Sequence, residues 1–275
     1  MYSSPDTTAE HLRFIAAFKS SLDSVTLNSP SSSSSQRPAT PTHDFMRLLK
    51  KRNKLLRVYT QNIDGLEGVN TGLVPVALEG VTPRSASAVG GKGKGKAKVE
   101  GDYVQLHGAV HAVRCTGCDF VRAWTDEDGE VFASGSVGAC PQCEERGASC
   151  SPCSSIPSIT LYNESPPSSS ALTIGSVSLS DLSSSPGPDV MLVLGTSLKI
   201  PGFKKLVKEF ARSVKSRGGV RVLANREEIG STSEWRDVFD YQGVSGRSLP
   251  PSLSSAPTGP HALSRSQFSA TRTPS

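Results

Sequence analysis

The chain has 275 residues, which is enough for one large domain or two small ones. Its formal net charge of +5 is a mild excess, and the basic residues lack the interleaved aromatic residues that favour nucleic-acid binding. No window is apolar for long enough to span a membrane, and the first residues lack the pattern of a signal peptide. We therefore expect an intracellular protein that has no membrane partner and no sequence-specific nucleic-acid partner, and whose paired cysteines bind metal.

The hydrophobic content of 36% is low, and the shortfall is confined to a few segments rich in Ser, Pro, Gly or Lys. Such segments cannot bury enough apolar surface to offset the entropy lost on ordering. We expect disordered insertions at 29–42, 80–101 and 163–188, and a disordered tail at 244–275. The remaining residues must supply the core.

Two helices are expected before the first strand, at residues 8–22 and 42–53, with Thr42 as the N-cap of the second. The apolar residues expected on one face of each are Leu12, Ile15, Ala16 and Phe18, and then Phe45, Leu48 and Leu49. A strand is expected at 55–59, followed by the polar run that begins at Thr60. Short extended pieces are expected at 104–106 and 112–114.

The second half of the chain has a clearer pattern. A continuous apolar run at 190–194 predicts a strand, apolar residues at helical spacing predict a helix over 201–215, and 220–223 predicts another strand. Strand, helix and strand at this spacing form a βαβ unit with a parallel pair. Continuous rather than alternating apolar strands fit a parallel sheet that is covered on both faces. The expected fold class is therefore α/β.

Two Cys-x-x-Cys pairs provide the ligands of a tetrahedral zinc ion, namely Cys115 with Cys118 and Cys140 with Cys143. A site closed by four cysteines leaves no position for water, so the metal is expected to be structural. A third pair, Cys150 and Cys153, could replace one of the two pairs or be spare. We favour the pair at 140 and 143.

Polar residues follow the predicted strands of the second half. Gly195, Thr196 and Ser197 come at the end of a parallel strand and ahead of a helix, where backbone N–H groups and hydroxyls suit phosphate or ribose. Any strand-to-helix turn also favours these residue types. Asn225 ends the next strand, where it could bond a ribose hydroxyl or make a turn.

His107 stands in the stretch Gln-Leu-His-Gly ahead of the first cysteine pair. A lone histidine is more often structural than catalytic. His111 is a rival, and the two would suggest a metal site if both lay on a helix. Gly108 and the β-branched Val110 argue against a helix there.

Together, the stretches TQNIDGLE, QLHG and GTSLK, the two cysteine pairs and a later strand ending in Ala-Asn resemble the sirtuin family across residues 55–240. Sirtuins are NAD-dependent protein-lysine deacylases. The stretches ITLYNESPP, GTSLKIPGFKKLVKEF and EWRDVFDY resemble its fungal nuclear branch, which is related to the silencing deacetylases that act on acetylated histones.

This resemblance implies a Rossmann-like parallel sheet of the NAD/FAD-binding type with a small inserted zinc-ribbon module. It implies that His107 and Asn62 are catalytic, with His107 as the general base that activates a ribose hydroxyl of NAD. The acetyl-lysine oxygen would attack the carbon that bears nicotinamide, giving free lysine, nicotinamide and O-acetyl-ADP-ribose. The implied NAD-binding residues are Gln61, Asn62, Ile63, Asp64, Gly195, Thr196, Ser197 and Asn225. The implied substrate-binding residues, which would pair with the peptide as an added strand, are Ile159, Leu161, Tyr162 and Asn163.

The implied domain covers residues 1–240, with Rossmann-like parts at 43–110 and 188–240 and the zinc module at 111–155. The first glycine is Gly65, so we expect the Gly-rich pyrophosphate loop and the first strand of the family to be missing, as in a truncated chain. No last strand is expected after Tyr241.

Two hypotheses follow from this departure. One is a deacetylase acting on an acetylated protein, namely histone, with weak or no activity in this chain. The alternative is a catalytically inactive zinc-containing binding module. The expected location is the nucleus, with the cytoplasm as the alternative, and chromatin-associated proteins are candidates for further partners.

Overall fold

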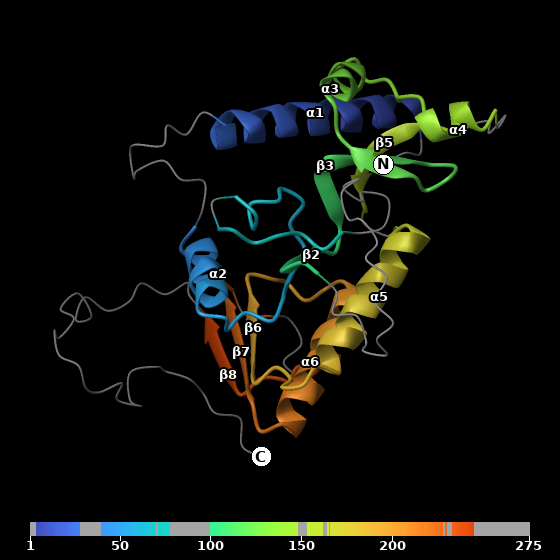
Figure 1. Cartoon of the computed structure of the whole chain (residues 1–275). Coiled ribbons are helices and arrows are strands. Elements are labelled where there is room, and N and C mark those ends of the chain that lie inside the picture. The colour runs from blue at the N-terminus through green and yellow to red at the C-terminus, as the bar shows by residue number, and fades with distance from the viewer. Residues whose placement is uncertain are drawn as a thin grey trace. The chain divides into compact units, whose positions relative to one another are not determined.

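The computed structural model describes residues 4–27, 40–69, 71–77, 100–147, 153–161, 164, 166–227, 229 and 233–244. They belong to two compact units, Met1–Val177 and Ser178–Ser275 (Figure 1). Most of 29–42, 80–101 and 244–275, which we expected to be disordered, lies outside the described residues. In the described part of the chain, no helix combines the length and the hydropathy that a membrane span requires.

The first unit contains one parallel pair of strands and one antiparallel sheet. Strand β1 pairs in parallel with β2, and β3 is the central strand of the order β4-β3-β5, with both of its neighbours antiparallel. The elements are α1 Pro5–Leu27, α2 Pro41–Lys51, β1 Val58–Thr60, β2 Tyr103–Gln105, β3 Gly108–Cys115, β4 Val121–Ala123, α3 Asp126–Ala133, α4 Pro141–Glu145 and β5 Ser155–Ile159, with α5 Ser168–Leu182 at the boundary of the two units.

Helix α1 packs on the antiparallel sheet of the first unit. Leu12 and Ala16 join a buried cluster with β3 and α3, and Ile15 joins a second cluster with β3 and β5. The prediction for Phe18 is wrong, because this side chain is exposed and stacks on Phe14 with the ring centroids 6.4 Å apart. Residues four apart lie on the same helical face, so Phe18 belongs to the face of Phe14 and not to that of Leu12.

The N-cap of helix α2 lies two residues before the predicted one. The observed N-cap is Thr40 rather than Thr42. Pro41 suits the first helical position because its φ is fixed near the helical value, and because an N–H at that position would have no partner within the helix. The predicted apolar stripe exists but is not buried, since Phe45 and Leu48 are each 42% exposed. Neither belongs to a hydrophobic cluster of the described residues.

The residues on either side of the 78–99 segment are bonded to each other at the start of β2. Val76 donates its N–H to the carbonyl of Tyr103 at 2.8 Å, and Asp102 donates its N–H to the carbonyl of Val74 at 2.6 Å. Gly101 has a φ of +115°, and a Cβ there would lie 2.7 Å from the Cα of Val76. Only glycine permits this close approach, which brings the ends of the 78–99 segment side by side.

Helix α5 shows that one of the three predictions of a disordered insertion is wrong. Residues 163–188 were expected to be disordered from their serine content, but Ser168–Leu182 forms a helix. Ile174 and Val177, three residues apart on one face, pack against Val76 and Val104, and Val177 is fully buried. A few apolar residues at helical spacing outweighed the serine-rich composition.

The second unit contains a sheet in the order β6-β7-β8 with all strands parallel. Its elements are β6 Val190–Leu194, α6 Pro201–Ser216, β7 Val220–Asn225 and β8 Tyr241–Val244. The predicted βαβ unit is therefore confirmed, and so is the α/β class with parallel strands. The buried core under α6 contains Met191, Val193, Leu198, Val207, Ala211, Val214, Leu223, Ile229, Trp235 and Phe239.

Two expectations for this sheet are wrong. A last strand exists, since β8 pairs with β7; its sequence Tyr-Gln-Gly-Val is too short and polar to be recognised without that partner. Burial along β6 also alternates within the second unit, where continuous burial was expected. Met191 and Val193 are buried, whereas Val190, Leu192 and Leu194 are 41–52% exposed.

Candidate functional site

The loop after β1 is shaped by its own polar side chains. The hydroxyl of Thr60 accepts the N–H of Asn62 at 3.1 Å, and the carboxylate of Asp64 accepts the N–H of Leu66 at 3.1 Å. These are short side-chain turns of the kind that Thr and Asp favour. The side chain of Asn62 is exposed at the turn. Thr60 and Asp64 therefore shape the loop, and the side chain of Asn62 is exposed on it.

Four hydrogen bonds join this loop to residues 106–111. The bonds run from Leu106 N to Thr60 O (2.9 Å), from His107 Nδ1 to Gln61 O (3.1 Å), from Val110 N to Ile63 O (2.9 Å) and from His111 Nε2 to Asp64 O (3.1 Å). The two stretches singled out in the sequence thus form a single framework, although 46 positions separate His107 from Gln61.

The hydrogen bond of His107 fixes the tautomer of its ring. A backbone carbonyl only accepts, so Nδ1 carries the proton that is donated to Gln61. In the neutral ring, Nε2 then holds a lone pair that can accept a proton. His111 lies in β3 and its Nε2 donates to a different carbonyl. The two histidines would suggest a metal site only if both lay on one helix. No helix runs through them, so this condition is not met.

Only glycine fits at position 108, because β5 lies too close to leave room for a Cβ. Its φ is +81°, and a Cβ there would lie 1.9 Å from the carbonyl oxygen of Ser158. Gly108 pairs with Ile159, and Thr160 donates its N–H to the carbonyl of His107 at 2.9 Å. The glycine of the Gln-Leu-His-Gly stretch thus allows β5 to lie directly beside His107.

The segment predicted to bind substrate begins in this strand. Ile159 is buried and Leu161 is half-buried, and both pack in the cluster that contains Val110. These side chains contribute to the core of the first unit. Tyr162 and Asn163 lie outside the described residues.

In the second unit, Asn225 holds the loop that follows β6. Its amide oxygen accepts the N–H of Thr196 at 3.0 Å, and its amide nitrogen donates to the carbonyl of Thr196 at 2.7 Å. Gly195 has a φ of +60°, and a Cβ there would have no neighbour within 4 Å. Gly195 and Ser197 are exposed. The loop therefore offers an open backbone surface at the carboxyl end of a parallel strand, where ligands bind in such sheets.

The four predicted zinc ligands come together in the first unit. The sulfurs of Cys115, Cys118, Cys140 and Cys143 all lie within 4.8 Å of one another. Cys115 and Cys143 are 3.8 Å apart and Cys118 and Cys140 are 3.7 Å apart. Tetrahedral coordination with Zn–S bonds of about 2.3 Å separates the sulfurs by about 3.8 Å. The cluster thus fits a closed structural zinc site.

The backbone around the first cysteine pair favours a thiolate. Burial opposes the charge on Cys115, but the N–H groups of Cys118 and Gly117 outweigh it and lower the pKa of this thiol to about 7. The N–H of Gly117 lies 3.3 Å from the sulfur of Cys115. A metal ligand must be deprotonated, so this arrangement assists zinc binding near neutral pH.

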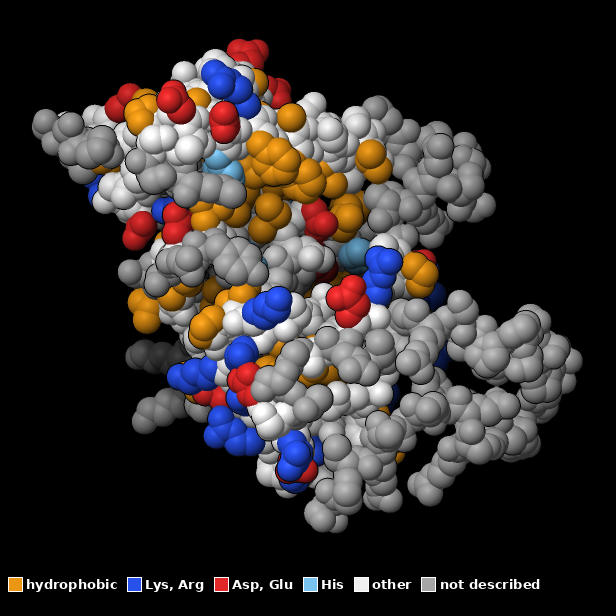
Figure 2. Space-filling view, turned by 180° about the vertical axis from the view of Figure 1, so that it is seen from behind, with side chains coloured by type: hydrophobic (Ala, Val, Ile, Leu, Met, Phe, Trp, Pro, Cys, Tyr) orange, Lys and Arg blue, Asp and Glu red, His pale blue; other side chains and the backbone are white. Residues whose placement is uncertain are grey.

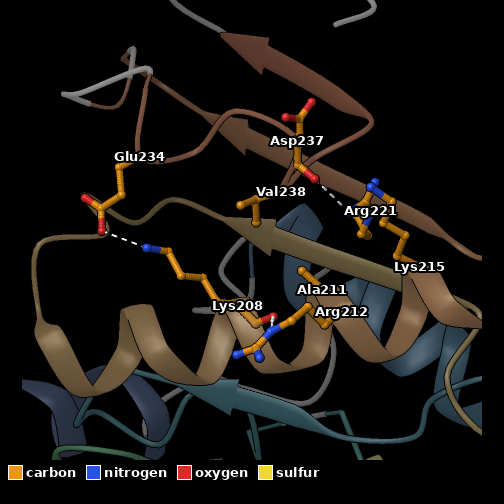
Figure 3. A pocket seen from close by; sticks show the side chains of 8 residues that line it. All are labelled: Lys208, Ala211, Arg212, Lys215, Arg221, Glu234, Asp237 and Val238. Carbon is orange, nitrogen blue, oxygen red and sulfur yellow. Dashed lines mark hydrogen bonds and ion pairs between the residues drawn. The ribbon is translucent and has the colours of Figure 1, made fainter. Parts of the chain in front are cut away.

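A separate pocket of about 400 Å³ lies on the second unit (Figure 3). Lys208 binds Glu234 at 2.9 Å there, and the buried Arg221 donates to the carbonyl of Asp237 at 3.0 Å. Lys and Arg side chains also gather in the lower part of the face shown in Figure 2. Arg221 stands at the start of β7 and Asn225 at its end, so this pocket lies at the opposite end of the sheet from Gly195.

In α/β sheets ligands bind at strand-end loops of this kind, and the first unit adds a four-cysteine module. Residues 19–77 match the Sir2 family. The chain is 34% identical over 216 residues to the NAD-dependent histone deacetylase HST3 of Saccharomyces cerevisiae, covering 74% of this chain and 44% of the relative. It is 34% identical to HST3 of Candida albicans, covering 75% and 42%.

The NAD-dependent protein deacetylase hst4 of Schizosaccharomyces pombe is also 34% identical, over 71% of this chain and 44% of the relative. A solved structure of Sir2 bound to an acetylated peptide aligns with a TM-score of 0.46 and 21% identity, over 74% of this chain and 63% of that chain. The chain is a sirtuin and resembles the fungal branch of that family. It spans less than half the length of these fungal relatives.

Proposed function

We propose that the protein is an NAD-dependent protein-lysine deacetylase whose substrates are acetylated histones. The reaction transfers the acetyl group from lysine to ADP-ribose and releases nicotinamide. The observation that carries the proposal is His107, whose Nδ1 is bound to the carbonyl of Gln61 while Nε2 keeps its lone pair. The names of the HST3 relatives support the substrate class.

His107 acts in this proposal as the general base for a ribose hydroxyl of NAD. Donation from Nδ1 to Gln61 keeps the ring in the tautomer that accepts a proton at Nε2 and stabilises the imidazolium that results. In this proposal the side chain of Asn62, which is exposed at the adjoining turn, contacts the nicotinamide or its ribose. Gln61, Ile63 and Asp64 contribute the loop that positions both side chains.

Gly195, Thr196 and Ser197 hold the phosphate or ribose groups of NAD in this proposal. The open space over Gly195 suits the close approach of a ligand to the backbone. Asn225 acts by fixing Thr196, because both ends of its amide are engaged there. NAD supplies the bond whose cleavage releases nicotinamide.

The proposal includes nuclear action and contact with chromatin proteins. The names of the fungal histone deacetylases support these two points. Ile159, Leu161, Tyr162 and Asn163 form the segment against which the acetylated peptide would pair. The strand that leads into this segment is fixed beside His107 by the hydrogen bond from Thr160.

One observation favours a second candidate, a zinc-containing binding module without turnover. Residues 1–64 contain no glycine, so they offer no Gly-rich loop to cradle a pyrophosphate ahead of β1. Such a module would bind an acetylated peptide through the β5 side of the first unit without consuming NAD.

Release of nicotinamide from NAD with an acetylated histone peptide separates the two candidates. The first requires turnover, even if slow, that His107→Ala abolishes and His43→Ala, on α2, leaves unchanged. Peptide binding by calorimetry without nicotinamide release would establish the second. Turnover that survives His107→Ala would contradict the assignment of the base.

A further inference from the structure

A fifth sulfur lies beside the four-cysteine cluster. Cys153 packs against Cys115, Cys140 and Cys143, and its thiol is a hydrogen-bonding neighbour of the Cys143 thiol. It does not belong to the group of four whose sulfurs are all within 4.8 Å of one another. Zinc takes four ligands in a closed site, so one thiol more than the metal needs is held in contact with the ligand set.

The backbone next to Cys153 is tied to both cysteine pairs. Ser154 donates its N–H to the hydroxyl of Thr116 at 3.1 Å, and Thr116 donates its N–H to the carbonyl of Ser154 at 2.9 Å. Thr116 lies between the two cysteines of the first pair.

The next residue along the chain makes the corresponding contacts with the second pair. Ser155 donates its N–H to the carbonyl of Gly138 at 2.8 Å and its hydroxyl to the carbonyl of Ala139 at 2.7 Å, directly before Cys140. Cys153 is thus placed by hydrogen bonds to the same two segments that carry the metal ligands.

Cys143 is the ligand that Cys153 is placed to replace. It stands in α4, a helix of five residues, whereas Cys115 ends the eight-residue strand β3. A single helical turn has few hydrogen bonds of its own and moves more readily than a central strand. The described contacts of Cys153 therefore connect the fifth sulfur to a buried ligand that stands in a single short helix.

We propose that Cys153 is an exchangeable zinc ligand that takes the position of Cys143. In the exchange, a bond forms between the Cys153 sulfur and zinc while the Cys143 sulfur leaves the metal. The proton of the Cys153 thiol passes to Cys143, so four thiolates remain on the metal and nothing is oxidised. The module thereby keeps its metal in either of two ligand sets, which differ in where α4 is attached.

Zinc affinity of full-length variants tests this exchange. All carry Cys150→Ser, which removes the cysteine outside the described residues. Cys143→Ser is expected to bind zinc within about tenfold of its parent, and adding Cys153→Ser is expected to weaken binding about a hundredfold or more, since each ligand carries a share of the total binding free energy. Cys118→Ser, with and without Cys153→Ser, is the matched control and should show no such difference.

Cobalt spectra give a second reading of the same variants. Cys143→Ser should retain the charge-transfer intensity of four thiolates and lose it when Cys153→Ser is added. Equal loss of zinc from Cys143→Ser and from the double variant would overturn the proposal. So would a three-thiolate spectrum in Cys143→Ser.

A third experiment measures the alkylation of cysteines in the zinc-loaded parent protein, in which none of the four zinc ligands has been replaced. If the exchange occurs, Cys143 spends part of its time off the metal and is alkylated faster than Cys115. Cys153→Ser should slow the alkylation of Cys143 severalfold, as measured by peptide mass spectrometry. An alkylation rate at Cys143 that does not depend on Cys153 would overturn the proposal.

Discussion

The zinc module and the second unit are held together by different means. In the module, the cluster around the metal site consists mainly of cysteine sulfurs, and strand β4 has only three residues. In the second unit, ten buried residues that include Trp235 and Phe239 form one core under α6. One sirtuin domain can therefore combine a part stabilised by a metal with a part stabilised by apolar burial.

Each part contains one of the two tryptophans of the chain, so the two parts can be followed separately. Trp124 packs on Phe132 of α3 with the ring centroids 4.9 Å apart. Trp235 is buried beside Phe239. Trp124→Phe leaves a reporter of the second unit, and Trp235→Phe leaves a reporter of the module.

Removal of zinc should have the largest effect and should be confined to the module. Binding of a structural zinc contributes on the order of 10 kcal/mol to folding in small zinc modules. A chelator should therefore shift the emission of Trp124 to the red, while the emission of Trp235 stays the same. Cys140→Ser should act like the chelator. A parallel change at both tryptophans would show that the two parts do not differ in this way.

Trp235→Ala should show the converse, with an effect confined to the second unit. Loss of a buried tryptophan side chain costs about 3–5 kcal/mol. We expect a lower urea midpoint for the second unit, followed by amide hydrogen exchange in its helix α6, with unchanged zinc affinity. Reduced zinc binding in this variant would contradict the separation.

Gly108→Ala tests the contact between β3 and β5 in the first unit. The new Cβ would lie 1.9 Å from the carbonyl of Ser158. The left-handed conformation alone costs a non-glycine residue about 1–3 kcal/mol. The collision adds to this cost and should open the contact between β3 and β5. Faster amide exchange at Thr160, which is bonded to His107, would report it.

Gly147→Ala is the control for Gly108→Ala. Gly147 has a φ of +58° but no neighbour within 4 Å of an added Cβ. It therefore shares the left-handed conformation and lacks the collision. If both substitutions have the same effect, backbone conformation rather than the approach of β5 explains the glycine at 108.

Acid should affect both parts, with the smallest change expected in the second unit. Burial opposes the charge on Asp128, but hydrogen bonds from Arg122 and Thr125 hold its pKa below 3.8. A hydrogen bond from Arg221 is the main cause that lowers the pKa of Asp240 below 3.8. A carboxyl with a lowered pKa stabilises the fold above its unfolded pKa, and this stability is lost as the pH falls through the folded value.

The free energy of unfolding should therefore fall less steeply between about pH 5 and pH 2 in Asp128→Asn than in the parent, as followed by the fluorescence of Trp124. Asp240→Asn should show a weaker change at Trp235, because its side chain is 35% exposed and solvent screens the pair. Added salt should weaken the effect at Asp240 more than that at Asp128. Identical acid curves for the parent and Asp128→Asn would contradict the role of the Arg122 pair.

Strong local patterns allowed much of this structure to be predicted. The apolar run Val190–Leu194 gave a strand with the predicted bounds, and the spacing of the cysteines predicted a cluster that the structure brings together. Helix α5 was missed because serine-rich composition hid two apolar residues that matter only once Val76 and Val104 lie beside them. Strand β8 was missed because its pairing depends on β7 rather than on its own residues.

The sequence singled out the residues of the candidate site but not the contacts that they make. Thr60 and Asp64 are polar because they form turns, and Asn225 is polar because it holds Thr196. The two turns are local, with partners two residues apart, whereas the contact of Asn225 with Thr196 depends on the register between two strands and is contained in no local pattern. The same holds for Gly108, whose requirement comes from Ser158.

The close approach of Val76 and Gly101 has a consequence for how the gene can vary. Because Val74 and Val76 are bonded to Asp102 and Tyr103, the number of residues between the two sides hardly affects the framework that carries His107. Doubling the length of a loop costs only about 0.6 kcal/mol in closure entropy. Insertions and deletions should therefore accumulate in this stretch among close homologues, while the codon at position 101 stays that of glycine.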